Sequence, residues 1–155
     1  MKILRYFLII ALIALVVIQF IRPDKQEGNY LAIDAFETET NMPAEVRAIF
    51  SNNCYDCHSG VTTYPWYADI APLSYWVNDH IEDGKRHFDV EEWNNYSLKK
   101  KDHKLDELIE EVEEGEMPLK SYTLLHGDLS DEEKELLENW AKEARAQIQS
   151  EMMVQ

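Results

Sequence analysis

Asn53-Cys54-Tyr55-Asp56-Cys57-His58-Ser59 is the stretch from which the rest of this 155-residue sequence can be interpreted, because it holds both cysteines of the chain. It follows directly on residues 42–50, where apolar side chains recur at helical spacing. Cys54 and Cys57 are three positions apart and His58 is adjacent to the second, which gives the pattern C-x-x-C-H. We therefore predict a short helix that leads into a turn bearing two thiols and one imidazole.

This pattern suits the covalent attachment of one haem. Two thiols at this spacing on a helical turn can reach the two vinyl groups of one porphyrin and form thioethers, and the adjacent imidazole can bind the iron. We predict haem c held by Cys54 and Cys57, with His58 as the proximal ligand of the haem iron. A zinc half-site, a redox dithiol and a small structural disulfide remain as alternatives. The zinc site lacks a second cysteine pair and the dithiol lacks a βαβ scaffold.

A second axial ligand is expected downstream, in the stretch Glu-Gly-Glu-Met-Pro-Leu over residues 114–119. Met117 follows a glycine that can end a helix, and Pro118 stiffens the loop. We predict that Met117 is the distal ligand of the haem iron. His126 is the rival because it is the histidine closest to this loop. The remaining histidines are weaker candidates: His80, His87 and His103.

Helical patterns also run through the rest of the sequence after residue 41. Ser130 and Glu133 form a capping box ahead of an apolar stripe at helical spacing. Gly115 is expected to end a helix over about residues 102–114, and Gly84 is expected to stop one over residues 73–83. No segment alternates with period two, so we predict an all-α fold of four or five helices.

The chain divides into three parts by composition. Residues 6–21, YFLIIALIALVVIQFI, are apolar and follow Lys2 and Arg5, which is the layout of an export signal. No small-x-small cleavage site follows, so we predict an uncleaved transmembrane signal anchor over residues 1–22, with a removed signal peptide as the alternative. Residues 23–41 are interpreted as a linker, and residues 42–150 as a cytochrome c-like helical haem domain.

Charge indicates where the domain lies and what it meets. Positive residues that precede an apolar helix stay on the cytoplasmic side, so the rest of the chain would be exported. We expect a single-pass protein of the bacterial inner membrane, with the haem domain in the periplasm. All 30 acidic residues follow the apolar run and the net charge is −15, which argues against nucleic-acid binding and against anionic lipid. A redox partner would then present a basic docking face.

The order of motifs resembles a family of bacterial haem-binding domains. The resemblance covers roughly residues 42–145 and rests on several short motifs: Cys54 to Ser59, Pro65-Trp66-Tyr67, Ala71-Pro72, Met117-Pro118 and Tyr122. It implies covalent haem c in an exported domain that transfers electrons or senses through haem. Ordinary class I cytochromes orient the proximal imidazole with a Gly-Pro carbonyl, and this chain has none. The carbonyl that orients His58 is therefore left open.

Single-electron transfer on the exported side of the membrane is the function that these features favour. A haem-based sensor or haem-carrying interaction module is the alternative. A peroxidase-like enzyme would need an open distal site with an acid or base, and a methionine ligand would close it. We therefore expect an electron carrier rather than a catalyst.

Overall fold

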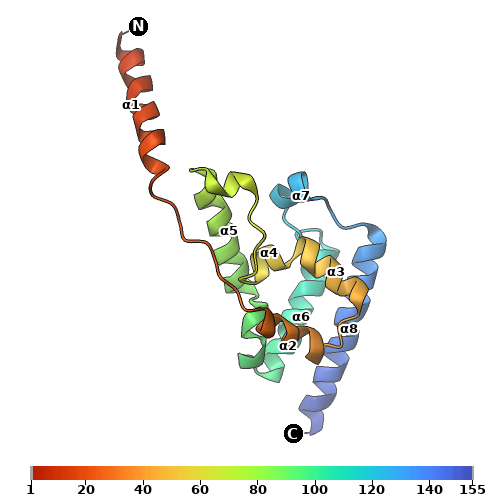
Figure 1. Ribbon diagram of the computed structural model, residues 1–155. Helices are drawn as coiled ribbons and strands as arrows, with labels where there is room; N and C mark the ends of the chain where they lie inside the picture. The colour runs from red at the N-terminus through yellow and green to blue at the C-terminus, as the bar shows by residue number, and fades with distance from the viewer. Residues whose placement is uncertain (1, 155) are drawn as a thin grey trace.

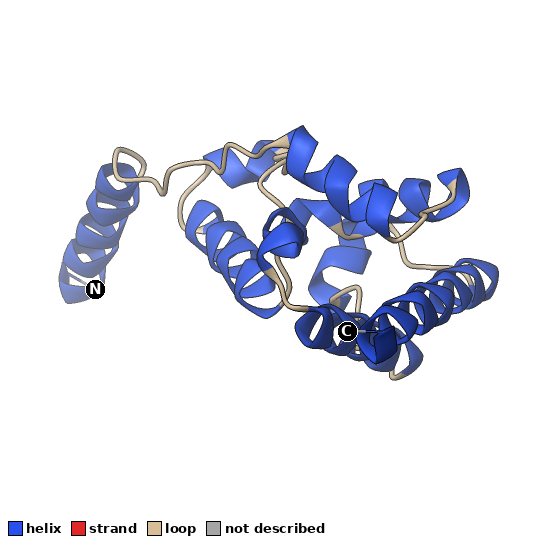
Figure 2. Cartoon of the chain, turned by 90° about the horizontal axis from the view of Figure 1, so that it is seen from below, coloured by secondary structure: helices blue, strands red, loops and turns tan. Residues whose placement is uncertain are grey.

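The computed structural model describes residues 2–154, and its regular structure there is entirely helical, as predicted (Figures 1 and 2). Eight α-helices and two short 3-10 helices follow one another along these residues. Their bounds are α1 Lys2–Ile18, α2 Tyr30–Glu39, α3 Ala44–Asn53, α4 Tyr55–His58, η1 Trp66–Asp69, α5 Leu73–His87, η2 Val90–Asn95, α6 Leu98–Glu113, α7 Lys120–His126 and α8 Asp131–Val154.

An aromatic cluster forms the centre of the core, where residues from α2, α3, η2 and α8 meet Phe88, which follows α5. Phe36 of α2 is fully buried and makes edge-on contacts with four rings: Phe50, Phe88, Trp93 and Trp140. Edge-to-face pairs of this kind add to the stabilisation from burial alone. The indole of Trp140 also donates a hydrogen bond of 3.0 Å to the backbone carbonyl of Thr40, which fixes α8 against the end of α2.

Two helix ends confirm signals in the sequence. Ser130 and Glu133 exchange hydrogen bonds as a capping box at the start of α8, each side chain accepting from the other's backbone N–H. Gly115 follows α6 with φ 72°, a left-handed conformation that glycine adopts without strain. The chain therefore leaves α6 just before Met117.

The predicted linker over residues 23–41 is wrong for its second half, because residues 30–39 form α2. Its apolar residues do not follow a clear helical spacing, but Ile33 and Phe36 are both buried in the core. The buried carboxylate of Glu37 accepts hydrogen bonds from Tyr55 at 2.8 Å and from Arg47 at 2.5 Å. Tertiary partners therefore stabilise a helix that local periodicity does not reveal.

The helix predicted to stop at Gly84 instead continues to His87. Gly84 lies where α5 crosses the C-x-x-C-H turn, and an added Cβ would be only 2.7 Å from the Cys57 carbonyl oxygen. The glycine therefore permits close packing of two helices and does not end one. The short helix α7 was not predicted at all.

The apolar N-terminal run forms α1, whose side chains are largely exposed. The helix ends at Ile18, four residues before the end of the predicted anchor over residues 1–22. Within residues 2–154, no helix combines the length and the apolar character needed to cross a membrane. The signal anchor over residues 1–22 stays a prediction.

Candidate functional site

The C-x-x-C-H turn directly follows α3, as the sequence predicts, and its residues after Cys54 form the one-turn helix α4. Cys54 breaks the helix, and its backbone carbonyl accepts from the N–H groups of both Cys57 and His58. Ser59 closes the turn: its hydroxyl donates to the Tyr55 carbonyl at 2.7 Å and accepts from the Val61 N–H at 3.1 Å. The backbone hydrogen bonds therefore fix all three candidate haem residues of the motif in one rigid turn.

The His58 ring is oriented by the backbone carbonyl of Phe88, which its Nδ1 approaches to 2.8 Å. Phe88 caps the C-terminal end of α5, so this helix supplies the partner that the sequence left open. An imidazole that donates its Nδ1 proton to a carbonyl has an unprotonated Nε2, the form that binds iron. Burial lowers the pKa of His58, and this favours the same neutral form.

Cys54, His58 and Met117 line a single cavity of about 280 Å³. The two candidate axial ligands, 59 positions apart in sequence, are brought together by the exit of the chain from α6. Most of the cavity wall is apolar and comes from α3, α6, α8 and the residues after α5: Phe50, Phe88, Leu108, Val112, Leu129 and Leu137. Its polar lining residues are Asn53, Asp83, His87, Lys104, Glu107 and Glu111.

This donor set fits a haem. A haem is a flat apolar ring with two charged propionates at one edge and an iron that takes one axial ligand on each face. The cavity offers an imidazole and a thioether as ligands, apolar walls for the ring, and charged lining groups that include Lys104. The Lys104 ammonium, which pairs with Glu107 at 2.5 Å, is the basic side chain available to meet a propionate.

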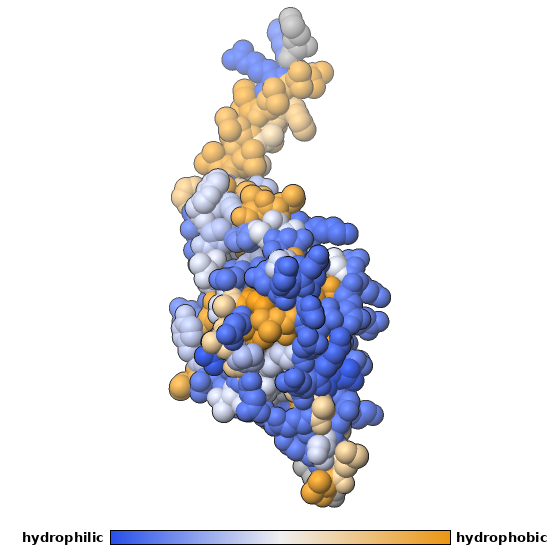
Figure 3. Space-filling view, turned by 90° about the vertical axis from the view of Figure 1, so that its right-hand side faces the viewer, coloured by the Kyte–Doolittle hydropathy of each residue, from blue (hydrophilic) through white to orange (hydrophobic). Residues whose placement is uncertain are grey.

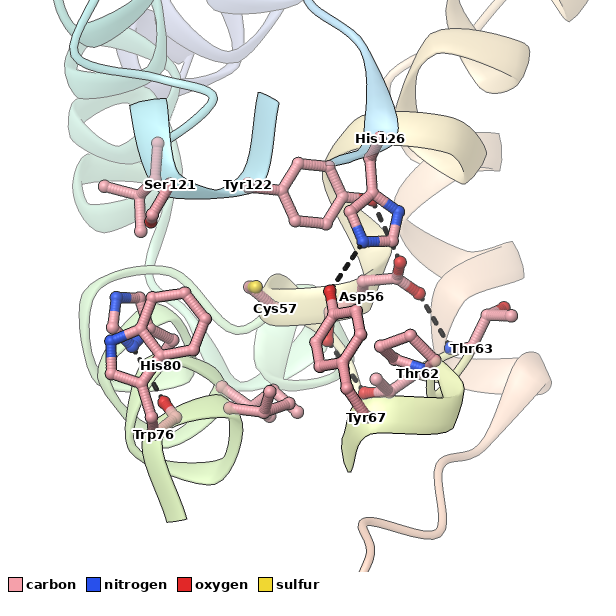
Figure 4. Close-up of a pocket in the computed structure, with 14 residues that line it drawn as sticks. Asp56, Cys57, Thr62, Thr63, Tyr67, Trp76, His80, Ser121, Tyr122 and His126 are labelled. Atoms are coloured by element: carbon pink, nitrogen blue, oxygen red, sulfur yellow. Dashed lines mark hydrogen bonds between the residues drawn. The ribbon is translucent and has the colours of Figure 1, made fainter. Parts of the chain in front are cut away.

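Cys57 lines a second, smaller hollow of about 50 Å³ on the other side of the turn (Figure 4). Residues 54–58 and the segment around residues 117–126 border both hollows. In Figure 4, Tyr67 and His126 point toward each other, and the Tyr67 hydroxyl lies 3.0 Å from His126 Nε2. The His126 ring also stacks on Tyr122, with 4.2 Å between ring centroids.

The structure therefore separates the two rival distal ligands. Met117 shares the cavity of His58, whereas His126 faces Tyr67 in the hollow of Cys57. Among the weaker candidates, His80 lines that same hollow and approaches the Trp76 carbonyl, and His103 is exposed beside Glu107. His87 lines the cavity of His58 but its side chain is mostly exposed.

The two thiols are free and are not paired in a disulfide. Burial raises the pKa of Cys54 to about 12 and the pKa of Cys57 to about 11. Both groups are thus protonated at neutral pH, unlike the low-pKa thiolates of redox dithiols. Within the described residues, no group of three or more His, Cys, Asp and Glu side chains is arranged to hold a metal ion.

Two tyrosines hold the motif in place from opposite sides. Tyr55, inside the motif, donates to Glu37 of α2, and burial followed by this hydrogen bond raises the pKa of its hydroxyl. Tyr122 of α7 donates to the Asp56 carboxylate at 3.0 Å and to the Asn52 carbonyl at 3.0 Å. The motif is therefore connected to α2 and to the segment that follows Met117.

Sequence reasoning missed Glu37 and the Phe88 carbonyl. Glu37 is the only acidic residue that the structure buries among residues 2–154, and its helix has weak periodicity. A backbone carbonyl leaves no mark in the sequence, since every residue has one. Tyr122 was noted as part of a motif, but its contacts with the turn were not foreseen.

A family model described as a haem-binding domain matches residues 13–143. The match covers most of the chain, and the chain belongs to this haem-binding domain family. No curated protein and no solved structure matches the chain.

Proposed function

We propose that this protein is a membrane-tethered c-type cytochrome, which holds one covalent haem and transfers single electrons on the exported side of the membrane. The observation that carries the proposal is the shared cavity of Cys54, His58 and Met117, beside a His58 ring oriented by the Phe88 carbonyl. Family membership supports haem as the cofactor. When bound, haem supplies a one-electron couple between ferric and ferrous iron.

In this proposal Cys54 and Cys57 would hold the haem through thioethers, the links that two thiols form with its two vinyl groups. The hydrogen-bonded turn would present both thiols from one short segment. His58 binds the iron through Nε2, while the Phe88 carbonyl keeps the Nδ1 proton and the ring orientation. Covalent attachment keeps the haem in the domain even when an axial bond breaks.

Met117 is proposed as the distal ligand. It lies in the His58 cavity, on the loop that Gly115 and Pro118 define. A thioether ligand favours the ferrous state relative to a second histidine and leaves no open coordination position for a substrate. This supports an electron carrier over a peroxidase-like enzyme or a gas sensor.

The location and the partner belong to the same proposal. The exposed apolar helix α1 carries Lys2 and Arg5 in its first turn, ahead of its apolar residues, which supports a tether with the rest of the chain exported. Several acidic side chains line the cavity, among them Asp83, Glu107 and Glu111. Acidic groups beside the haem site favour a redox partner with a basic docking face.

The test is the full chain, expressed with a cytochrome c maturation system. We expect the wild type to keep a haem stain after denaturing electrophoresis and C54A/C57A to lose it. M117A should lose the ligand field of a thioether-bound ferric iron and bind added imidazole, whereas the matched control M152A should behave as the wild type.

Three outcomes would contradict the proposal, each at a different point. A wild type without stain would refute covalent haem. An M117A spectrum identical to wild type would place the distal ligand elsewhere, with H126A as the next variant. A chain found only in the soluble fraction after cell lysis would refute the tether but not the haem site.

A further inference from the structure

Apolar side chains outside α1 gather on the part of the domain where α1 ends. Figure 3 shows this apolar surface continuing from the helix onto the adjoining end of the domain. The exposed residues on η1 and the start of α5 are Trp66, Ile70, Leu73, Tyr75 and Trp76, and we call this set the apolar end face. The helix α7, with exposed Leu124 and Leu125, lies beside it, held by the Tyr67–His126 hydrogen bond.

Specific contacts attach the end of α1 to this face. The Gln19 side chain accepts from the Ala71 N–H at 3.0 Å and donates to the Ala71 carbonyl at 2.8 Å. The Tyr75 hydroxyl donates to the Ile21 carbonyl. The Lys25 ammonium pairs with the Asp69 carboxylate at 2.9 Å. The domain is therefore held directly at the end of the apolar helix and does not hang from a free linker.

We propose that the apolar end face rests in the interfacial layer of the same lipid bilayer that α1 enters. This inference rests on the tether of the proposed function and extends it to an orientation. Tryptophan and tyrosine, whose rings are apolar with a polar edge, are enriched at the boundary between hydrocarbon and water. The face carries two tryptophans and one tyrosine within eleven consecutive residues.

The length of α1 supports the same conclusion. Its 17 residues span about 25 Å, which is less than the roughly 30 Å of a hydrocarbon core. A short apolar helix is accommodated by local thinning or by drawing its flanking residues toward the membrane. Gln19 and the attached Ala71 backbone then lie at the membrane boundary, and the exposed rings beside them enter it.

Zwitterionic lipid is the occupant that the charges favour. The chain as a whole is strongly acidic, and an anionic surface would repel it. At the face itself Lys25 is neutralised by Asp69. Because Trp76 also lines the hollow that contains Cys57, the contact brings the Cys57 side of the motif toward the bilayer.

Tryptophan fluorescence of the full chain in phosphatidylcholine vesicles tests the contact. The chain has four tryptophans: Trp66 and Trp76 on the face, and Trp93 and Trp140 buried in the core. Emission is compared between vesicles with brominated and with unmodified acyl chains. Bromine should quench the wild type, and W66F/W76F should lose this quenching.

The control places a new tryptophan far from the face. Tyr30 and Trp66 are both 76% exposed, so the variant Y30W/W66F/W76F carries an equally exposed indole at the start of α2. We expect no quenching by brominated lipid in this variant. Wild-type quenching no greater than that of W66F/W76F, in protein that sediments with the vesicles, would refute the contact and leave the tether intact. A full chain that does not sediment with vesicles would refute both.

Discussion

Gly84 offers the sharpest test of how the C-x-x-C-H turn is held, because α5 crosses the turn at this residue. A Cβ added to Gly84 would lie 2.7 Å from the Cys57 carbonyl oxygen and 3.1 Å from the Cys57 Cβ. Neither contact can relax by rotation of a flexible side chain, since one partner is backbone and the other is the first atom of a residue in a rigid turn. G84A must therefore move α5 or the turn.

The expected magnitude combines two opposing effects. Alanine in a helix interior is favoured over glycine by about 1 kcal/mol. Overpacking against a fixed neighbour costs roughly 1–3 kcal/mol, and a backbone contact of 2.7 Å places G84A in the upper part of this range, at about 2–3 kcal/mol. The net loss is about 1–2 kcal/mol, which lowers the melting temperature of a chain of this length by roughly 2–8 °C.

Thermal unfolding followed by circular dichroism measures this effect, and haem content gives a second measurement. The same displacement would disturb His58, because its partner Phe88 caps the end of α5. We therefore expect G84A to bind less haem than wild type. D79A, an exposed site on the same helix, is the matched control and should keep both properties. A G84A protein as stable as D79A would refute the close approach and the reasoning built on it.

Two further predictions concern other contacts of the domain. Y122F removes the hydrogen bonds to Asp56 and Asn52, should cost about 1 kcal/mol, and should speed the binding of added imidazole by loosening the segment after Met117. Burial alone would raise the pKa of Asp102, but hydrogen bonds from Arg145 and Gln149 outweigh this effect, and the pKa of Asp102 is lowered. R145M removes one of these partners and should therefore reduce the free energy of unfolding in urea by about 1 kcal/mol at neutral pH.

The sign of the pH effect follows from the lowered pKa of Asp102. The ion pair of Asp102 stabilises the protein fully at a pH above the ordinary pKa of an aspartate carboxyl, and this stabilisation is lost as the pH falls below it. The difference in free energy of unfolding between wild type and R145M should therefore close below about pH 4. Y30F and K142M are the controls, at exposed sites on α2 and α8. Equal imidazole binding by Y122F and Y30F would contradict the first prediction, and a difference that persists at acid pH would contradict the second.

The sequence predicted those structural features that depend only on a few adjacent residues and on one physical cause. The spacing of Cys54 and Cys57, the capping box at Ser130 and the left-handed exit at Gly115 each depend on a few adjacent residues, and each lies where expected. Met117 was likewise placed on the loop after Gly115. Met117 also shares a cavity with His58, because α6 packs so that the chain leaves it beside the C-x-x-C-H turn. No local sequence pattern encodes this packing.

The errors have a common physical origin in tertiary contacts. The sequence predicts a helix stop at Gly84, but the lack of a Cβ there permits a helix crossing. The sequence predicts a linker at the segment containing Glu37, but two partners from α3 and α4 satisfy the buried Glu37 carboxylate. The local propensity of glycine is the same at a helix stop and at a helix crossing, and that of glutamate is the same in a linker and in a buried helix. Only the tertiary contacts distinguish these cases.

The segment between α1 and α2 is part of the haem-binding fold and not a spacer. A Cβ on Gly28 would lie 2.2 Å from the carbonyl carbon of Gly60, so the two backbones cross in direct contact just after the C-x-x-C-H turn. Glu91 accepts hydrogen bonds from the N–H groups of both Asn29 and Gly60, and Lys85 pairs with it at 3.0 Å. Backbone packing and a shared carboxylate thus connect the segment after α1 to the end of the haem motif.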